Sequence, residues 1–250
     1  MSHRKRRLGA RQIGSEPPGS GIRHSRFHQQ IRFLQVVAGA QDDIPCAGLV
    51  CATGPARQAR AQRIGLQVHN SATIVQQLLR FELDLGLIEG SCRDPELIVE
   101  PWVEDELVVF CAPGHPLARG EPVDLPELAA QDWILRETGS GTRETFDQAL
   151  RHFYGHLNVR LELEHTEAIK RAVESGLGVG CISRLALREA IRRGSLVAVE
   201  TPELDLRRQF QFVTHRRKYV TAGMREFIDL CRRMTAGAAR SDLIELPFIP

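Results

Sequence analysis

The sequence predicts an α/β fold, built from strands and helices that alternate along the chain from about residue 63. Short apolar runs rich in β-branched residues alternate with segments whose apolar residues recur every three or four positions. Alternating strands and helices form βα units, whose strands lie mostly parallel in one sheet. Residues 1–62 lack this alternation and are dominated by Gly, Pro, Arg, His, Gln and Ala, a composition that argues against a packed core.

The expected strands are short, and turns or helices separate them. Ile64–Val68 alternates apolar and polar residues, and Leu83–Ile88 is typical of a buried strand. A short helix or strand is also possible over Ile31–Ala38. The remaining expected strands are Glu106–Ala112, Trp133–Leu135, Val159–Leu163, Val179–Ser183, Leu196–Val199 and Gln209–Thr214.

The helices are expected where a capping residue precedes an amphipathic segment. Asn70 or Ser71 can cap a helix over Ala72–Arg80. A second helix opens at Gly139–Thr142 and runs to about Tyr154. The other expected helices are Leu125–Ala129, Glu167–Ser175 with Gly176 as its C′ residue, Leu185–Arg193 and Ala222–Met234.

The net charge of +2 hides an uneven distribution. Residues 1–62 hold ten Lys/Arg and three Asp/Glu, a formal charge of +7, while the remaining 23 basic and 28 acidic residues give −5. The basic segment could be a DNA-binding arm or simply a solvated, poorly ordered stretch, and both interpretations stay open. It shows no helix-turn-helix pattern, so we expect DNA contact only if such a motif is supplied upstream.

Composition excludes several other classes. No run of 18 apolar residues occurs, so we expect no membrane partner, and no apolar segment follows the N-terminal Arg/Lys cluster as it would in a secretory signal. None of the six cysteines forms a CxxC pair, which favours reduced thiols in a cytoplasmic protein. We predict no cofactor and no metal site; His152 and His156 have metal-pair spacing but no third ligand nearby.

One family shares a series of motifs with this chain, in the same order and over about 170 residues. The matching segments are Asn70–Val75, Glu82–Gly90, Val99–Trp102, Glu104–Val109, Pro113–Ala118, Leu135–Arg143, Ile169–Val173 and Gly176–Gly180. Together they resemble the effector-binding domain of LysR-type transcriptional regulators, and most closely regulators of sulfur assimilation and sulfite reductase genes.

This resemblance implies two Rossmann-like lobes joined by two crossover strands, as in type 2 periplasmic binding proteins, with a ligand between the lobes. Glu106–Ala112 would be the first crossover and Gln209–Thr214 the return. The family's winged helix, linker helix, and first strand and helix of lobe one are not recognisable before Arg63, as a shifted or truncated reading frame would produce. The expected division is a basic, poorly ordered segment 1–62, lobe one 63–107 and 214–237, lobe two 108–213, and a tail 238–250.

Six residues are candidate ligand contacts. Ser140, Gly141 and Thr142 belong to a Gly/Ser/Thr loop at a helix start, where backbone N–H groups and hydroxyls can hold an anion; the alternative is an ordinary capped loop. Ser71 can offer its hydroxyl to a ligand or act as a helix N-cap. Glu89 follows a buried strand, where it faces the cleft or pairs with an arginine. Thr166 is a ligand hydroxyl or an N-cap.

The resemblance therefore implies a sensor, not an enzyme, that binds a small anionic effector and forms a homodimer or homotetramer. No catalytic motif occurs in the sequence. Two alternatives remain: an exported solute-binding protein of the same fold, or an enzyme built on it. Cys181 is the one candidate nucleophile for the enzyme alternative.

Overall fold

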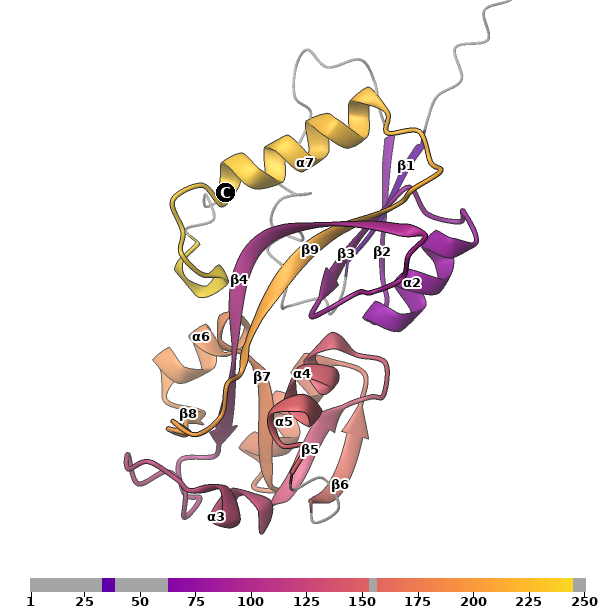
Figure 1. The fold of residues 1–250 in the computed structure, drawn as a ribbon. Helices are drawn as coiled ribbons and strands as arrows, with labels where there is room; N and C mark the ends of the chain where they lie inside the picture. The colour runs from indigo at the N-terminus through magenta and orange to yellow at the C-terminus, as the bar shows by residue number, and fades with distance from the viewer. Residues whose placement is uncertain (1–32, 39–62, 153–156, 245–250) are drawn as a thin grey trace, which may run out of the picture. The chain divides into compact units, whose positions relative to one another are not determined.

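The computed structural model describes residues 33–38, 63–152 and 157–244, with residues 33–38, 63 and 64 described by their backbone (Figure 1). The strands are β1 (Phe33–Ala38), β2 (Arg63–Val68), β3 (Leu85–Glu89), β4 (Leu97–Cys111), β5 (Asp132–Arg136), β6 (Asn158–Leu163), β7 (Val179–Ser183), β8 (Val197–Ala198) and β9 (Arg207–His215). The helices are α2 (Ser71–Leu79), α3 (Leu125–Ala129), α4 (Gly141–Ala149), α5 (Thr166–Glu174), α6 (Arg184–Arg193), α7 (Ala222–Met234) and the 3₁₀ turn η2 (Ser241–Leu243). In the described part of the chain, no helix combines the length and apolar character needed to cross a bilayer.

Two lobes share the long strands β4 and β9, as Figure 1 shows. The first part of β4, Leu97–Glu106, pairs antiparallel with β9, and its last part, Leu107–Phe110, pairs with β7. Hydrogen-bonded strands follow one another in the order β2-β1-β3-β9-β4-β7-β5-β6, with β8 beside β4. The predicted α/β class and the two lobes joined by crossover strands are confirmed.

The crossover strands lie partly outside the segments expected from the sequence. β4 begins at Leu97, well before Glu106, and it tolerates Pro101 because its register with β9 shifts between Pro101 and Val103. β9 pairs with lobe one from Arg207 onward, so Gln209–Thr214 belongs to the lobe-one sheet. The chain therefore crosses from lobe two to lobe one at the start of β9, before Gln209.

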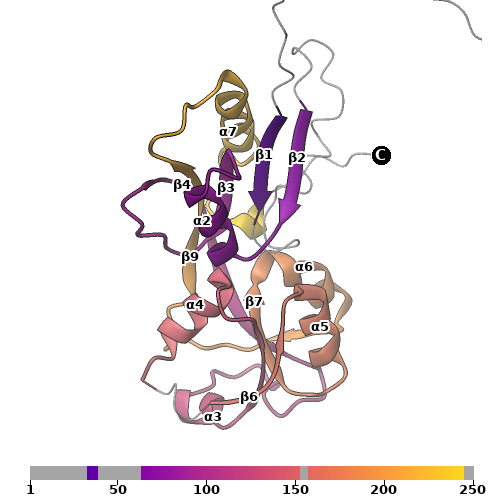
Figure 2. The same cartoon turned by 90° about the vertical axis from the view of Figure 1, so that its right-hand side faces the viewer.

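Lobe one packs helices on both faces of its sheet. Alternate strand residues point to opposite faces, so one face meets α7 and the other meets α2 (Figure 2). The α7 side buries Leu85, Leu87, Val103, Phe210, Phe212, Met224, Phe227, Ile228, Cys231 and Ile244. The α2 side buries Ile74, Leu78, Leu83, Ile88, Leu97 and Val213.

β1 lies between β2 and β3 and pairs parallel with both. Of the helix and the strand considered for Ile31–Ala38, the structure forms the strand. Its six residues pair with β2 and its last three, Val36–Ala38, pair with β3, so backbone groups that would otherwise lack partners are bonded. The lobe-one sheet therefore includes a strand from a segment in which no family element is recognisable. The other proposed elements of residues 1–62 lie outside the described residues.

Lobe two has the same layered plan. One face of its sheet buries Leu107, Val109, Cys111, Trp133, Leu135, Phe146, Leu150, Val179 and Cys181 together with α3 and α4 residues. The other face buries Val108, Phe110, Ile134, Ile169, Val173, Ile182 and Leu187 under α5 and α6. Because both faces are covered, β7 is buried along its whole length.

Two helix ends test the reasoning about helix boundaries. α4 stops at Ala149, earlier than Tyr154, because the C-cap Leu150 is buried whereas the following Arg151 and His152 are exposed. α5 ends at Glu174 with Ser175 as its C-cap, and Gly176, whose φ is +77°, is the C′ residue as expected. The N–H groups of Gly176 and Leu177 donate to Val173 and Ala172, which forms a Schellman motif.

Candidate functional site

A buried cluster of charged side chains lies where the crossover strands pass between the lobes. Arg208, near the start of β9, donates from Nη1 to Glu89 Oε2 at 2.6 Å and from Nε to Asp105 Oδ2 at 2.6 Å. The side chains of Arg208, Glu89 and Asp105 are at most 2% exposed. Buried charges are stable only when they are paired and hydrogen-bonded, so this cluster holds β3, β4 and β9 together.

Lobe two joins the cluster through the first turn of α4. Thr142 Oγ1 donates to Glu89 Oε2 at 2.8 Å and accepts from Arg208 Nη1 at 2.8 Å. A Cβ added to Gly141 would lie 2.1 Å from the carbonyl oxygen of Glu89. Glycine at position 141 is thus required for α4 to approach the end of β3 this closely.

The C-terminal turn fastens to the same region. Ser183 Oγ donates to Asp105 Oδ1 at 2.7 Å, and Ser241 Oγ donates to the same oxygen. Arg240 Nη1 donates to Glu106 Oε2 at 2.7 Å. Both lobes and the segment after α7 therefore meet at residues 105 and 106 of β4.

The N-terminus of α2 makes another contact between the lobes. Ala72 N donates to Gly139 O at 3.0 Å, which joins α2 to the loop before α4. Asn70 is the N-cap, because its side chain accepts from Thr73 N at 3.0 Å. The hydroxyl of Ser71, the first helical residue, donates to Glu89 O at 3.3 Å. The choice between Asn70 and Ser71 as cap is thereby settled in favour of Asn70.

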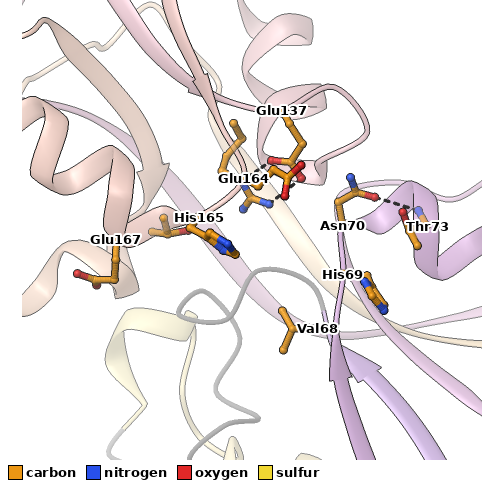
Figure 3. Close-up of a pocket in the computed structure, with 10 residues that line it drawn as sticks. Val68, His69, Asn70, Thr73, Glu137, Glu164, His165 and Glu167 are labelled. Carbon is orange, nitrogen blue, oxygen red and sulfur yellow. Dashed lines mark hydrogen bonds and ion pairs between the residues drawn. The ribbon is translucent and has the colours of Figure 1, made fainter.

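A cavity of about 580 Å³ opens between lobe one and lobe two beside this contact (Figure 3). Its wall from lobe one comes from the end of β2 and the start of α2, and its wall from lobe two comes from the ends of β5 and β6. The lining residues are Val68, His69, Asn70, Thr73, Arg136, Glu137, Glu164, His165, Thr166 and Glu167. This position beyond the carboxyl ends of parallel strands is where ligands bind in open α/β sheets.

Thr166 gives this cavity an unsatisfied polar group. The residue is 3% exposed, and its Oγ1 atom has no hydrogen-bond partner among the described residues. The interpretation of Thr166 as the N-cap of α5 is wrong, because His165 occupies that position and makes no side-chain cap bond. A buried hydroxyl without a partner costs about 1–3 kcal/mol, which a ligand in the cavity could recover.

The charges around the cavity are mixed. Arg136 Nε donates to Glu137 Oε2 at 2.8 Å, and both side chains are largely buried. Glu164 and Glu167 are exposed at the rim. The N-termini of α2 and α5 both lie at the cavity, and the positive end of each helix dipole favours an anionic oxygen there, although the N–H groups of Ala72 and Thr73 in α2 are already bonded.

The six candidate residues fall into three groups. Thr166 lines the cavity just described, while Ser71 and Ser140 line a second cavity between α2 and α4. Glu89, Gly141 and Thr142 lie in the contact between the lobes. Of the two interpretations of Glu89, contact with the cleft and pairing with an arginine, the structure forms the pair with Arg208.

Several site residues were not predicted. Arg208 and Asp105 form the centre of the buried cluster, and Asn70, Thr73 and Arg136 line the first cavity. A charged residue at an inward position of an otherwise apolar strand was the available signal for Asp105 and Arg208. Asn70 carried a signal too, since it was one of the two expected caps.

The cysteine and histidine alternatives have little support in the geometry. Cys181 on β7 is 1% exposed, and burial raises the pKa of its thiol to about 12. Burial also raises the pKa of Cys111 to about 11. A thiol with such a pKa yields little thiolate near neutral pH. His152 is exposed, and His156 lies outside the described residues.

The geometry defines a two-lobed α/β ligand-binding domain with a polar cavity between its lobes. The sequence family described as "LysR substrate binding domain" matches residues 56–236, and the chain belongs to this family.

A curated relative, the "Uncharacterized HTH-type transcriptional regulator YeiE" of Escherichia coli (strain K12), is 47% identical over 168 residues. That match covers 67% of this chain and 57% of the relative, so the chain spans less than two thirds of the relative's length.

Solved structures agree with this assignment. The regulatory domain of CcmR from Synechocystis PCC6803, solved in complex with 2-PG, superposes with a TM-score of 0.72 at 25% identity and covers 82% of this chain and 98% of that one. The effector-binding domain of QuiR in complex with shikimate has a TM-score of 0.70 at 17% identity, covers 81% of this chain and 96% of that one, and supports the fold. The predicted family is confirmed; the sulfur-assimilation subgroup stays a prediction.

Proposed function

We propose that this chain is the effector-sensing part of a LysR-type transcriptional regulator and that a small anionic molecule binds in the cavity lined by Asn70, Arg136 and Thr166. The carrying observation is the buried Thr166 hydroxyl, which faces no partner in the described part of the chain. The volume of about 580 Å³ lies within the range of small-molecule sites. The ligands 2-PG and shikimate in the two related structures add support for a small polar effector.

The anion would be held by backbone and hydroxyl groups more than by free cations. The N-termini of α2 and α5 approach the cavity from opposite lobes, and each helix has nine residues. Each end carries about half a positive charge. Arg136 is already engaged with Glu137, so it contributes less than an isolated arginine would. An anion with several hydroxyl or carboxylate oxygens satisfies such donors best.

Ligand binding would act on the lobe contacts. A molecule touching Asn70 in one lobe and Thr166 in the other favours the arrangement in which both walls are close. The bond between Ala72 and Gly139 and the contact between Thr142 and Glu89 belong to the same junction. A shift in the population of lobe arrangements is then passed to whatever DNA-binding part and partner subunits the full regulator contains.

The test is a calorimetric titration of the full chain with 2-PG and with shikimate, repeated on Thr166→Val. Removing the hydroxyl while keeping the shape is expected to weaken binding about fivefold to tenfold, since one hydrogen bond to a charged group is lost. Thr201→Val is the matched control, because Thr201 lies away from the cavity. Equal affinity in wild type and Thr166→Val would contradict the assignment of this cavity.

A further inference from the structure

A second cavity, of about 890 Å³, lies between α2 and α4, which stand next to each other across the lobe junction (Figures 1 and 2). Ala72 and Gly139, whose backbones join the lobes, are both on its wall. The first cavity takes Asn70 and Thr73 from the same helix start, so the two cavities use different residues of α2.

The inner wall of this second cavity is apolar. Val75 and Ile88 come from lobe one, and the half-buried thiol of Cys92 lies on the loop after β3. Apolar side chains that line an open cavity gain free energy when a hydrophobic group covers them. Any occupant should therefore have an apolar body.

One buried polar atom in this wall lacks a partner. Ser140 is 2% exposed, and its Oγ makes no hydrogen bond with a described residue. Ser140 is the N-cap of α4, yet its side chain makes no cap bond. The hydroxyl is thus available to a ligand, and its oxygen can accept a hydrogen bond.

The charges of the lining residues select the sign of the ligand's polar group. Asp94, Glu144 and Asp147 face two arginines, Arg93 and Arg143. Arg143 forms ion pairs with Asp147, at 2.9 Å from Nε to Oδ1, and with Glu162 outside the cavity, at 2.8 Å from Nη1 to Oε2. These carboxylates largely neutralise its positive charge. Glu144 forms no ion pair with a described residue. Burial raises the pKa of the Cys92 thiol most, the backbone N–H of Asp94 lowers it, and the carboxylates of Asp94 and Glu144 raise it by smaller amounts.

The positive end of α4 does not reverse this balance. Glu144 itself lies in the first turn of α4, and its full negative charge exceeds the half charge of the helix N-terminus. The lining residues carry three carboxylates against two arginines, a net negative charge.

We propose that this second cavity binds a small primary amine whose ammonium group lies near Glu144 and Ser140 and whose apolar body covers Val75, Ile88 and Cys92. The site is separate from the effector cavity and does not depend on it for binding. Because α2 and the loop before α4 line both cavities, occupancy of one changes the affinity of the other, and the effect is reciprocal.

The experiment compares three probes of one shape on the full chain by isothermal titration calorimetry: 3-methylbutylamine, 3-methylbutanol and 3-methylbutanoate. The amine is expected to bind at least tenfold more tightly than the alcohol, and the acid more weakly than both. Glu144→Gln should weaken binding of the amine without changing binding of the alcohol, whereas Ser140→Ala should weaken binding of both. Glu226→Gln, an exposed charge on α7, is the matched control.

Two results would overturn the proposal: no saturable amine binding at millimolar concentrations, or an acid that binds as well as the amine. An equal loss of amine affinity in Glu144→Gln and Glu226→Gln would also overturn it. Thr166→Val should bind the amine like wild type, so failure at the effector cavity and failure here are distinguishable. Circular dichroism melting of each variant establishes that it is folded, and Glu144→Gln tests the site even if Ser140→Ala is unstable.

Discussion

Replacing Arg208 by methionine tests whether the buried cluster holds the lobes together. The substitution keeps most of the side-chain volume but leaves Glu89 and Asp105 facing each other without a cation, at 2% and 0% side-chain exposure. Removing one partner of a buried ion pair costs about 3–5 kcal/mol. For a domain of this size, about 1 kcal/mol lowers the melting temperature by roughly 2–4 °C. The expected drop is therefore about 6–20 °C.

Arg232→Met is the matched control. Arg232 also lies over a β9 phenylalanine, 5.7 Å from the ring centre of Phe212, as Arg208 lies 5.3 Å from that of Phe210. It also pairs with a carboxylate, Glu100 at 2.6 Å, but both side chains are nearly half exposed. An exposed pair contributes about 0–1 kcal/mol.

Thermal and urea unfolding followed by circular dichroism compares the two variants. Tryptophan fluorescence adds a probe in each lobe, since Trp102 lies in lobe one and Trp133 in lobe two. Similar losses in Arg208→Met and Arg232→Met would refute the reasoning, because burial is the main feature that separates them.

Two further predictions follow from the close contacts and the thiols. Gly141→Ala places a methyl group against Glu89 O and should cost about 1–3 kcal/mol and weaken effector binding, whereas Gly114→Ala, with open space around it, should do neither in the same melting and titration assays. In timed iodoacetamide labelling read by mass spectrometry, Cys92 should react before Cys111 and Cys181. Because burial raises the pKa of the Cys92 thiol, its labelling rate should keep rising as the pH passes 9. Faster labelling of Cys181 than of Cys92 would contradict the buried placement of β7.

Local patterns predicted most elements because their signals are local. The bounds of α3, β7 and α7 agree with the expected Leu125–Ala129, Val179–Ser183 and Ala222–Met234. The early part of β4 was missed because Pro101 and the neighbouring carboxylates interrupt its apolar pattern. Its pairing with β9 supplies the stability that the pattern does not reveal.

The site was predicted less completely because its partners are distant in sequence. Arg208 meets Glu89 119 positions away and Asp105 103 positions away. No periodicity encodes such a contact, although pairing of Glu89 with an arginine was one of its two interpretations, because a free carboxylate in the cleft would oppose an anion. The loop 139–142 was recognised correctly as the start of a helix, but its residues divide between a cavity and a lobe contact.

The continuity of β4 limits how the two lobes can move. A flexible loop between domains permits a wide swing, but a 15-residue strand that is hydrogen-bonded on both sides of the junction can change mainly by twisting about its own axis. Asp105 and Glu106 lie at the point of β4 where this twisting would occur, and the C-terminal segment is hydrogen-bonded to both side chains. Ligand binding would therefore be transmitted as a small rotation of one lobe against the other.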